Sequence, residues 1–270
     1  MPFFVTPEDV KLNYQIAGRG KPLLFLHGWA MCSRVWKYQV ESFSRDFQVI
    51  CLDLPGHGIS ESPPGACDFA TLTRDVARFI EGLRLEMVTI IGWSLGASLA
   101  LKLVTSHRLP VVALVLVDGT PSFMVRDDFT HGLPAAAIKR MLKLIDADFT
   151  RALQEFNSLL LSQQERALAD RDEMWDLLTN AGYLPRKEVA RSLLVELARE
   201  DLRDIVAAVS IPVLLMHGDE DRICLPGASR YMKEHLERAD MVTFSGAGHA
   251  PFLTQAGCFN HKLGDFLRSL

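Results

Sequence analysis

A serine flanked by glycines gives this sequence its clearest chemical signal. The pentapeptide Gly92-Trp93-Ser94-Leu95-Gly96 follows an aliphatic, β-branched run, Met87 to Ile91, which predicts a buried parallel strand. From Leu95 onward, leucines recur every four residues, as on one face of a helix. Glycines two residues before and after a serine permit a turn sharp enough to expose its hydroxyl above the sheet, as in a nucleophile elbow. We therefore predict that Ser94 is a nucleophile, and a purely structural serine turn is the alternative.

A serine hydroxyl is a poor nucleophile at neutral pH, so it needs a histidine base. Three of the eight histidines lie near the ends of predicted strands, namely His27, His57 and His249. His249 follows the last predicted strand, in a loop of small residues from Gly246 to Pro251 that can approach another backbone closely. We predict His249 as the general base, in preference to the other two.

The histidine in turn needs an acid that orients it. The loop after a predicted strand ending at Met216 contains Asp219, Glu220 and Asp221, and Asp118 ends the preceding apolar run. Asp221 lies late enough in its loop to fold back toward the histidine. We therefore prefer Asp221 as the acid and keep Asp118 as the alternative.

Two backbone N–H groups are candidates for stabilising an oxyanion. Leu95 directly follows the nucleophile, and Trp29 directly follows His27-Gly28 at the end of another predicted strand. Losing one such donor typically costs on the order of 10²–10³ in rate. Trp29 also carries a large apolar side chain, which favours packing beside the site.

Apolar runs and helical periods alternate along most of the chain, which predicts the α/β class with a doubly wound, mostly parallel sheet. Sites in such folds lie at the carboxyl ends of the strands. Between about Pro121 and Ser210 only helical periods occur. We predict an α/β core of residues 1–120 and 205–270 and an inserted all-helical lid of residues 121–204, the alternative being helices that merely cover one sheet face. An antiparallel edge hairpin is predicted at 3–17, strands at 22–26, 47–52, 87–91, 111–117, 212–216 and 240–244, and helices at 33–43 and 69–83.

Composition narrows the classes of partner. The chain has 270 residues, of which 49% are hydrophobic and 23% charged, as expected of a globular protein with a sizeable core. Its formal charge of −4 does not favour nucleic acid or an anionic membrane as a partner. The long apolar stretch from Met87 to Ser106 could suggest a membrane span, but Lys102 and two glycines argue against it. Five scattered cysteines without metal-like spacing and a start without a signal-peptide pattern predict a reduced, cytoplasmic protein.

Five motifs together resemble the α/β-hydrolase superfamily across nearly the whole chain. More narrowly, they resemble the esterases of biotin synthesis that demethylate pimeloyl-acyl-carrier-protein methyl ester. Serine, acid and histidine follow one another in the order of the family triad, so the resemblance implies catalytic roles for Ser94, Asp221 and His249. The motifs are His27-Gly28-Trp29, Asp53-Leu54-Pro55-Gly56-His57-Gly58, Gly92-Trp93-Ser94-Leu95-Gly96, His217-Gly218-Asp219-Glu220-Asp221 and Gly248-His249-Ala250-Pro251-Phe252.

The resemblance also implies residues that contact the substrate. Family members line the acyl channel with a lid helix that bears an F-x-x-L pattern, which would match Phe156 to Leu160. The implied substrate-binding residues are Trp29, Ser94, Leu95, Phe156, Asn157, Ser158, Leu159, Leu160 and His249.

Lids of this family bind the acidic carrier protein through arginines. Arg151 matches that pattern, but the residue four positions later is Glu155. A basic cluster on one face of a predicted helix could replace the missing arginine, so the expected docking surface is Lys139, Arg140, Lys143 and Arg151. A solvated face without a partner is the alternative.

The sequence as a whole predicts a serine carboxylesterase that needs no metal or cofactor. By resemblance, its substrate is the methyl ester of pimeloyl-acyl-carrier protein, with activity on short-chain esters as well. A general short-chain esterase, a lactonase or a C–C bond hydrolase would use the same triad. A hydrolase-fold receptor or scaffold would bind a ligand with little turnover.

Overall fold

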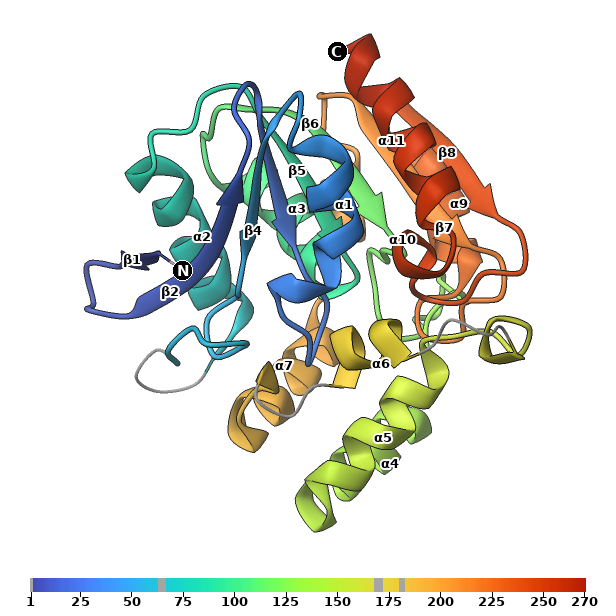
Figure 1. Ribbon diagram of the computed structural model, residues 1–270. Coiled ribbons are helices and arrows are strands. Elements are labelled where there is room, and N and C mark those ends of the chain that lie inside the picture. Colours follow the sequence, from blue (N-terminus) through green and yellow to red (C-terminus); the bar gives the residue numbers. More distant parts are fainter. Residues whose placement is uncertain (1, 63–66, 168–171, 180–182) are drawn as a thin grey trace.

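The computed structural model describes residues 2–62, 67–167, 172–179 and 183–270. Their centre is an eight-stranded sheet with the order β1-β2-β4-β3-β5-β6-β7-β8 (Figure 1). Every neighbouring pair from β4 to β8 is parallel, whereas β2 runs antiparallel to both β1 and β4. The strands are β1 Phe3–Val5, β2 Lys11–Ala17, β3 Pro22–Leu26, β4 Gln48–Leu52, β5 Val88–Trp93, β6 Val111–Val117, β7 Val213–Gly218 and β8 Ala239–Phe244.

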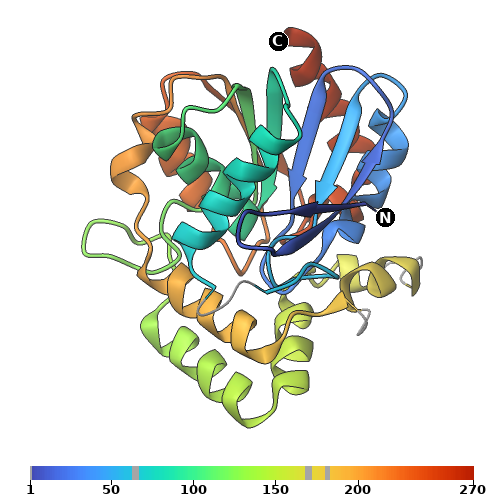
Figure 2. The ribbon, with the colours of Figure 1, turned by 90° about the vertical axis from the view of Figure 1, so that its left-hand side faces the viewer.

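Helices cover both faces of this sheet (Figure 2). One layer holds α1 (Lys37–Phe43), which follows the 3-10 turn η1 (Ser33–Trp36), together with α10 (Pro251–Thr254) and α11 (Ala256–Ser269). The other layer holds α2 (Phe69–Gly82), α3 (Leu95–Ser106), α8 (Arg203–Val206) and α9 (Pro226–His235). The predicted doubly wound, mostly parallel α/β sheet is therefore confirmed.

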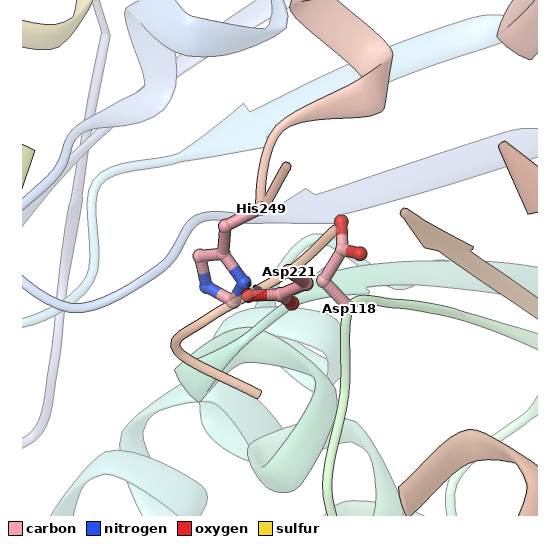
Figure 3. Close-up of side chains that lie close together, drawn as sticks. All are labelled: Asp118, Asp221 and His249. Atoms are coloured by element: carbon pink, nitrogen blue, oxygen red, sulfur yellow. Dashed lines mark hydrogen bonds and ion pairs between the residues drawn. The ribbon is translucent and has the colours of Figure 1, made fainter. Parts of the chain in front are cut away.

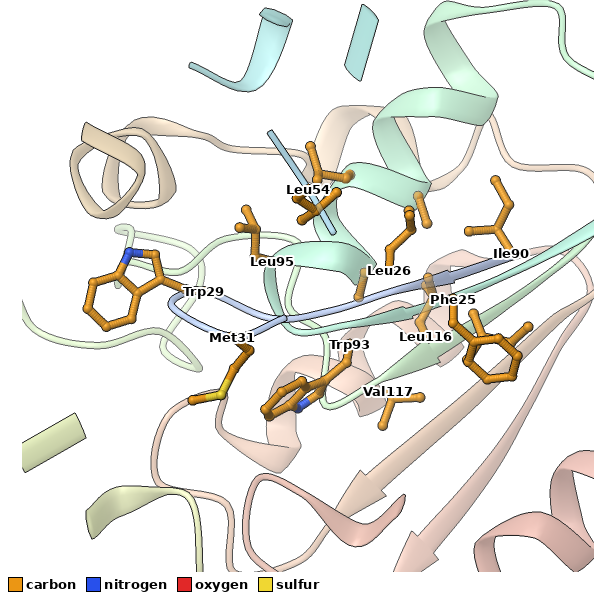
Figure 4. Close-up of a cluster of buried hydrophobic side chains, with 14 of the residues drawn as sticks. Phe25, Leu26, Trp29, Met31, Leu54, Ile90, Trp93, Leu95, Leu116 and Val117 are labelled. Carbon is orange, nitrogen blue, oxygen red and sulfur yellow. The ribbon is translucent and has the colours of Figure 1, made fainter. Parts of the chain in front are cut away.

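The central strands are apolar and buried, which explains why their runs were readable in the sequence. All residues of β3 and β5 are buried, as expected for parallel strands covered on both faces. Side chains from β3, β5, β6 and the loops after them pack together beneath the carboxyl ends of these strands (Figure 4). Burying each large apolar side chain contributes roughly 1.5–3 kcal/mol, so this cluster is a rigid base for whatever lies above it.

The chain between β6 and β7 forms a helical insert. Its helices are α4 (Ala135–Ala147), α5 (Phe149–Leu159), α6 (Asp172–Thr179) and α7 (Lys187–Arg199), with a short 3-10 turn η2 (Glu165–Ala167). Figure 1 shows these helices together beyond one end of the sheet. Isolated bridges, such as that between Ser122 and Asp201, are the β pairings that the described part of the insert contains. Helix α8 crosses the boundary predicted at residue 204 and packs on α3, and the division into core and lid stays a prediction.

The long apolar stretch around Ser94 is divided by a turn. Its first part forms β5 and its second part α3, so it is not one continuous helix. Among the described residues, no helix combines the length and the apolar character needed to cross a bilayer.

Candidate active site

Ser94 occupies a strained turn between β5 and α3. Its backbone has φ 54° and ψ −111°, a conformation that costs a non-glycine residue on the order of 1–3 kcal/mol. The Ser94 N–H donates to the carbonyl of Val117 at 2.9 Å, which fixes the turn to the neighbouring strand β6. The sequence motif therefore corresponds to a sharp strand–turn–helix corner, as predicted.

Both glycines of the motif are required by close backbone approaches. A Cβ atom on Gly92 would lie 2.3 Å from the carbonyl oxygen of Gly96, across the turn. A Cβ atom on Gly96 would lie 2.3 Å from the carbonyl oxygen of Leu26, at the end of β3. Because neither position has room for a side chain, α3 can start directly against the ends of β5 and β3.

His249 and Asp221 form a buried pair. His249 Nδ1 donates to Asp221 Oδ2 at 2.6 Å, and Asp221 Oδ1 accepts backbone N–H groups of Ile223 (2.8 Å) and Cys224 (3.1 Å). Burial raises the pKa of Asp221, but the charges and hydrogen bonds of His249 and His217 outweigh it and lower that pKa to about 2. The carboxylate is therefore charged at neutral pH and orients the His249 ring.

The other ring nitrogen of His249 is the one that could act as a base. His249 Nε2 is buried and has no hydrogen-bond partner in the part of the chain that the structure describes, so the bond to Ser94 is not made here. Such bonds are often long in unliganded enzymes and tighten with substrate. Trp93, adjacent to Ser94, donates its indole N–H to the His249 carbonyl at 2.7 Å, with ring centroids 5.4 Å apart. This contact ties the histidine loop to the serine turn.

The alternative histidines are held in the core by backbone groups. His27 Nε2 accepts from the Leu54 N–H at 3.0 Å, and its Nδ1 donates to the Gly28 carbonyl at 2.8 Å. His57 lies against His27 with ring centroids 5.1 Å apart, and burial and His27 lower its pKa to about 3. Both rings stabilise the loops after β3 and β4, so His249 is the one of the three candidate bases that is hydrogen-bonded to a carboxylate.

The two candidate oxyanion donors lie at the ends of adjacent strands. Leu95 is the first residue of α3, where the N–H has no acceptor within the helix. Trp29 follows β3, whose Leu26 pairs with Gly92 of β5. The approach of Gly96 to the end of β3 brings these two backbone segments together, as an oxyanion site requires.

An apolar pocket opens over Ser94. It encloses about 640 Å³, including the part open to solvent, and its lining is mostly apolar. Trp29 joins it to the insert, because its indole N–H donates to the Ala190 carbonyl on α7 at 2.8 Å and its ring meets that of Phe156 edge-on at 4.7 Å. The lining residues are Trp29, Ser94, Phe123, Leu133, Ala137, Ile138, Arg140, Met141, Phe156, Leu159, Leu194, Leu197, Arg222 and Ile223.

The five lid residues implied by resemblance face different surroundings. Phe156 and Leu159 line the pocket over Ser94. Asn157 and Ser158 line a separate cavity between α5 and α6. Leu160 is buried, and its carbonyl accepts the His249 N–H at 2.7 Å. Among these five, two side chains are thus placed to touch a substrate bound at Ser94, and Leu160 instead holds the histidine loop.

The expected docking cations are exposed on α4 and α5, and one of them, Arg140, also lines the pocket over Ser94. Two of them share Glu155 as an acidic partner. Arg140 Nη1 donates to Glu155 Oε2 at 2.8 Å, and Arg151 Nε lies 3.5 Å from Glu155 Oε1. Lys139 and Lys143 are exposed on the same helix as Arg140. The structure therefore pairs Arg140 and Arg151 with the glutamate that departs from the family pattern.

Three residues near the candidate triad were not predicted to act there together. His217 lies at the end of β7, and its Nε2 is 3.3 Å from Asp221 Oδ2. Asp118 directly follows β6, and its Oδ1 is 3.8 Å from the same nitrogen. Glu165 of η2 accepts the N–H of Gly248, next to His249, at 2.8 Å. The positions of His217 and Asp118 at the ends of predicted strands could have indicated that they lie near the site. The spacing of Ser162 and Glu165, which is that of a capping box, could have indicated the role of Glu165 as an acceptor of backbone N–H groups.

Asp118, Asp221 and His249 each offer one metal-ligating atom, and these atoms lie within 4.8 Å of one another. Both oxygens of Asp221 already accept hydrogen bonds, one of them from His249 Nδ1. A metal ion would have to break the acid–histidine bond, so this donor set fits a proton-transfer site better than a metal centre.

Comparisons with known proteins identify the family and agree with the fold. Residues 21–256 match the family described as alpha/beta hydrolase fold. The pimeloyl-[acyl-carrier protein] methyl ester esterase of Nitrosomonas europaea is 35% identical over 249 residues, covering 90% of this chain and 94% of that protein. The enzyme of the same name from Nitrosospira multiformis is 31% identical, covering 96% and 99%. An esterase from Exiguobacterium antarcticum has the same fold, with a TM-score of 0.92 at 24% identity over 98% of each chain.

Proposed function

The chain belongs to the alpha/beta hydrolase family, and from this premise we propose that it is a serine carboxylesterase with Ser94 as nucleophile, His249 as base and Asp221 as orienting acid. The observation that carries the proposal is the buried 2.6 Å bond between His249 and Asp221, tied through Trp93 to the strained turn at Ser94. Backbone strain and a buried acid–histidine hydrogen bond are retained at a site where they serve chemistry.

The reaction proceeds in two half-reactions. Ser94 Oγ attacks the ester carbonyl while His249 Nε2 takes its proton, and the N–H groups of Trp29 and Leu95 hold the oxyanion. Collapse breaks the bond to the alcohol, which leaves with the proton from His249. Water then attacks the acyl-serine with His249 again as base, which releases the acid and restores Ser94. The mechanism uses no metal or cofactor.

For the natural substrate, we propose the methyl ester of pimeloyl-acyl-carrier protein. Two relatives that are 35% and 31% identical over nearly their whole lengths carry the name of that activity. The pocket also suits this ester, because an aliphatic acyl chain would lie against the apolar side chains Phe156, Leu159 and Leu194. Short-chain esters would enter the same pocket.

The first test replaces the nucleophile. We expect Ser94→Ala to lower kcat by roughly 10⁴–10⁶ while the thermal unfolding midpoint stays near that of the parent, because the side chain is small and sits at the pocket floor. Activity is measured on p-nitrophenyl esters, and labelling by a fluorophosphonate probe is followed by mass spectrometry. Retained hydrolysis in the folded variant would falsify the proposed mechanism.

The second part of the test identifies the substrate. The parent protein is assayed on short p-nitrophenyl esters, lactones and pimeloyl-acyl-carrier-protein methyl ester, and the proposal requires the highest kcat/KM on the last. A preference for lactones would make the protein a lactonase with the same triad. Labelling of Ser94 without turnover of any ester would indicate a receptor.

A further inference from the structure

Asp118 is a buried carboxylate that the proposed mechanism does not use. It ends β6 with a positive φ of 45°, and its side chain is fully buried. Its Oδ1 accepts the Gly218 N–H at 2.9 Å, while Oδ2 has no hydrogen-bond partner among the described residues. A buried, partly unsatisfied carboxylate in a strained backbone is costly, so a purely structural role accounts poorly for it.

The groups that face Asp118 include the candidate acid and the candidate base. His217 Nε2 lies 3.8 Å from Asp118 Oδ1, and the ligating atoms of Asp118, Asp221 and His249 lie within 4.8 Å of one another. Figure 3 shows these three side chains converging from separate segments of the chain. The Cys224 thiol also lies close enough for Asp118 to act on its pKa, which burial raises well above the usual value. Asp118 therefore lies next to the position where positive charge develops in catalysis.

Asp221 cannot take on more partners as that charge appears. It already accepts two backbone N–H groups and the His249 N–H, and His217 lies 3.3 Å from the oxygen that bonds His249. We propose that Asp118 is a positioning residue that acts as a second carboxylate for His249, stabilising its protonated form together with Asp221. The proposal rests on the proposed function, since it needs His249 to be the base.

The titration of Asp118 is consistent with this role. Burial and the charge of Asp221 raise the pKa of Asp118, and the charges of His217 and His249 lower it. The net result is a pKa of about 7. Its carboxyl therefore changes charge in the neutral range, and a proton on His249 favours the ionised form. An asparagine at this position keeps the acceptor for Gly218 N–H and removes only the charge.

The test is a double-mutant cycle on a p-nitrophenyl ester at pH 8 with Asp118→Asn, Asp221→Asn and both together. Removing the orienting acid alone typically costs about 10⁴ in kcat. We expect a smaller loss for Asp221→Asn, on the order of 10²–10³, because Asp118 partly replaces it. The factor by which Asp118→Asn lowers kcat should then be at least about tenfold larger in the Asp221→Asn protein than in the parent protein. Equal factors in both backgrounds would overturn the proposal.

The pH dependence separates charge from structure. As the pH falls, we expect the ratio of kcat/KM between Asp221→Asn and the double variant to decline toward one, because Asp118 becomes protonated. The decline should centre below about pH 7, since Asp221→Asn removes a charge that raises the pKa of Asp118. A ratio that does not change with pH indicates a structural residue and overturns the proposal.

A single conservative variant covers the case in which the double variant does not fold. Asp118→Asn alone should lower kcat by about three- to tenfold at pH 8 and less at pH 5.5, with KM little changed, because the charge acts on the reacting state. An equal effect at both pH values contradicts the role. Ser94→Ala serves as the reference. Full activity in Ser94→Ala would contradict the proposed triad, whereas equal factors in the double-mutant cycle would contradict only the role of Asp118.

Discussion

His217 links the two carboxylates beneath the triad. Its Nε2 lies 2.8 Å from the Cys224 carbonyl, so this nitrogen carries a hydrogen, and its Nδ1 lies 2.6 Å from Ser229 Oγ. Burial lowers the pKa of His217, but the hydrogen bond to Asp221 and the charges of Asp118 and Asp221 outweigh it and raise the pKa to about 9. A buried imidazolium between two acids is therefore part of the folded protein at neutral pH.

This raised pKa predicts how stability depends on pH. The folded state holds the His217 proton more tightly than the unfolded state, so the stabilisation is fully present below about pH 6.5 and is lost as pH rises through about 9. When the pH is raised from 7 to 9.5, the thermal unfolding midpoint should fall in both proteins. We expect the fall to be on the order of 5 °C larger in the parent than in His217→Gln. Melting curves of both proteins in matched buffers check this, and parallel pH dependences would contradict it.

The residue types of the triad were predictable, but the charge cluster around it was not. The glycine spacing around Ser94 and the small-residue loop at His249 are sequence signals with a geometric cause. The contacts of Asp118 and His217 depend on the pairing of β6 with β7, whose side chains meet only in the folded sheet. Asp118 was therefore readable as an alternative acid, and not as a neighbour of the preferred one.

At the scale of elements, the loop that carries His249 is held from two sides. A Cβ atom on Gly218 would lie 2.0 Å from the Gly248 carbonyl oxygen, and one on Gly248 would lie 2.7 Å from the Leu160 carbonyl oxygen. Glu165 Oε2 accepts the N–H groups of Gly248 and Ser162, each at 2.8 Å. The insert and β7 therefore determine together where the histidine backbone lies.

Removing the glutamate contact is expected to displace the histidine. Glu165→Ala leaves the buried Gly248 N–H without its acceptor, which costs about 1–3 kcal/mol of stability, and a displacement near 1 Å can cost about 10² in rate. We expect kcat on a short ester to fall by roughly 10–100-fold. Glu165→Gln keeps an acceptor oxygen and should retain most activity.

The matched control is Glu188→Ala, an exposed glutamate on α7. We expect it to leave kcat and the unfolding midpoint unchanged. A Glu165→Ala protein that keeps full kcat despite lower stability would show that the histidine loop does not need this contact.

The bounds of the elements were most predictable where the sequence is apolar without interruption. The predicted ranges for β3 and β6 match the structure, because their runs are apolar throughout. Helices α9 and α11 were not singled out, since their apolar residues are interrupted by polar ones on the outer face. The separation of Asn157 from Phe156 depends on how α5 packs, which sequence spacing alone does not give.

At the scale of the whole molecule, the question is how a carrier protein would reach the pocket. The chain carries a formal charge of −4, so an acidic carrier would be repelled overall and would need a local basic surface. We propose Lys139, Arg140, Lys143 and Arg151 as this surface, although Arg140 and Arg151 lie against Glu155. Exposed pairs of this kind contribute only about 0–1 kcal/mol, so a carrier could compete for both arginines.

Two sets of substitutions on this surface should act in opposite directions. Lys139→Glu with Lys143→Glu should raise KM for a carrier-bound ester by roughly tenfold, while Glu155→Gln should lower it two- to threefold by releasing Arg140 and Arg151. The lysine changes should leave KM for a free short ester unchanged, because neither lysine lines the pocket. Steady-state kinetics on both substrates at low ionic strength check this, with the exposed Glu234→Gln on α9 as the control. Equal shifts on both substrates would exclude a carrier-docking role.

The strand order also has a consequence for when the protein becomes active. Ser94 lies between the neighbours β5 and α3, but Asp221 and His249 follow β7 and β8, which join the sheet only after the whole insert has been made. Pairing β6 with β7 closes a long loop, and such non-local contacts form late because their entropic cost comes first. During synthesis, which runs from the N-terminus, the residues of the serine turn are made before the residues of its base. A nascent or truncated chain is therefore expected to be inert toward the esters around it, and hydrolysis begins only when the last strand is in place.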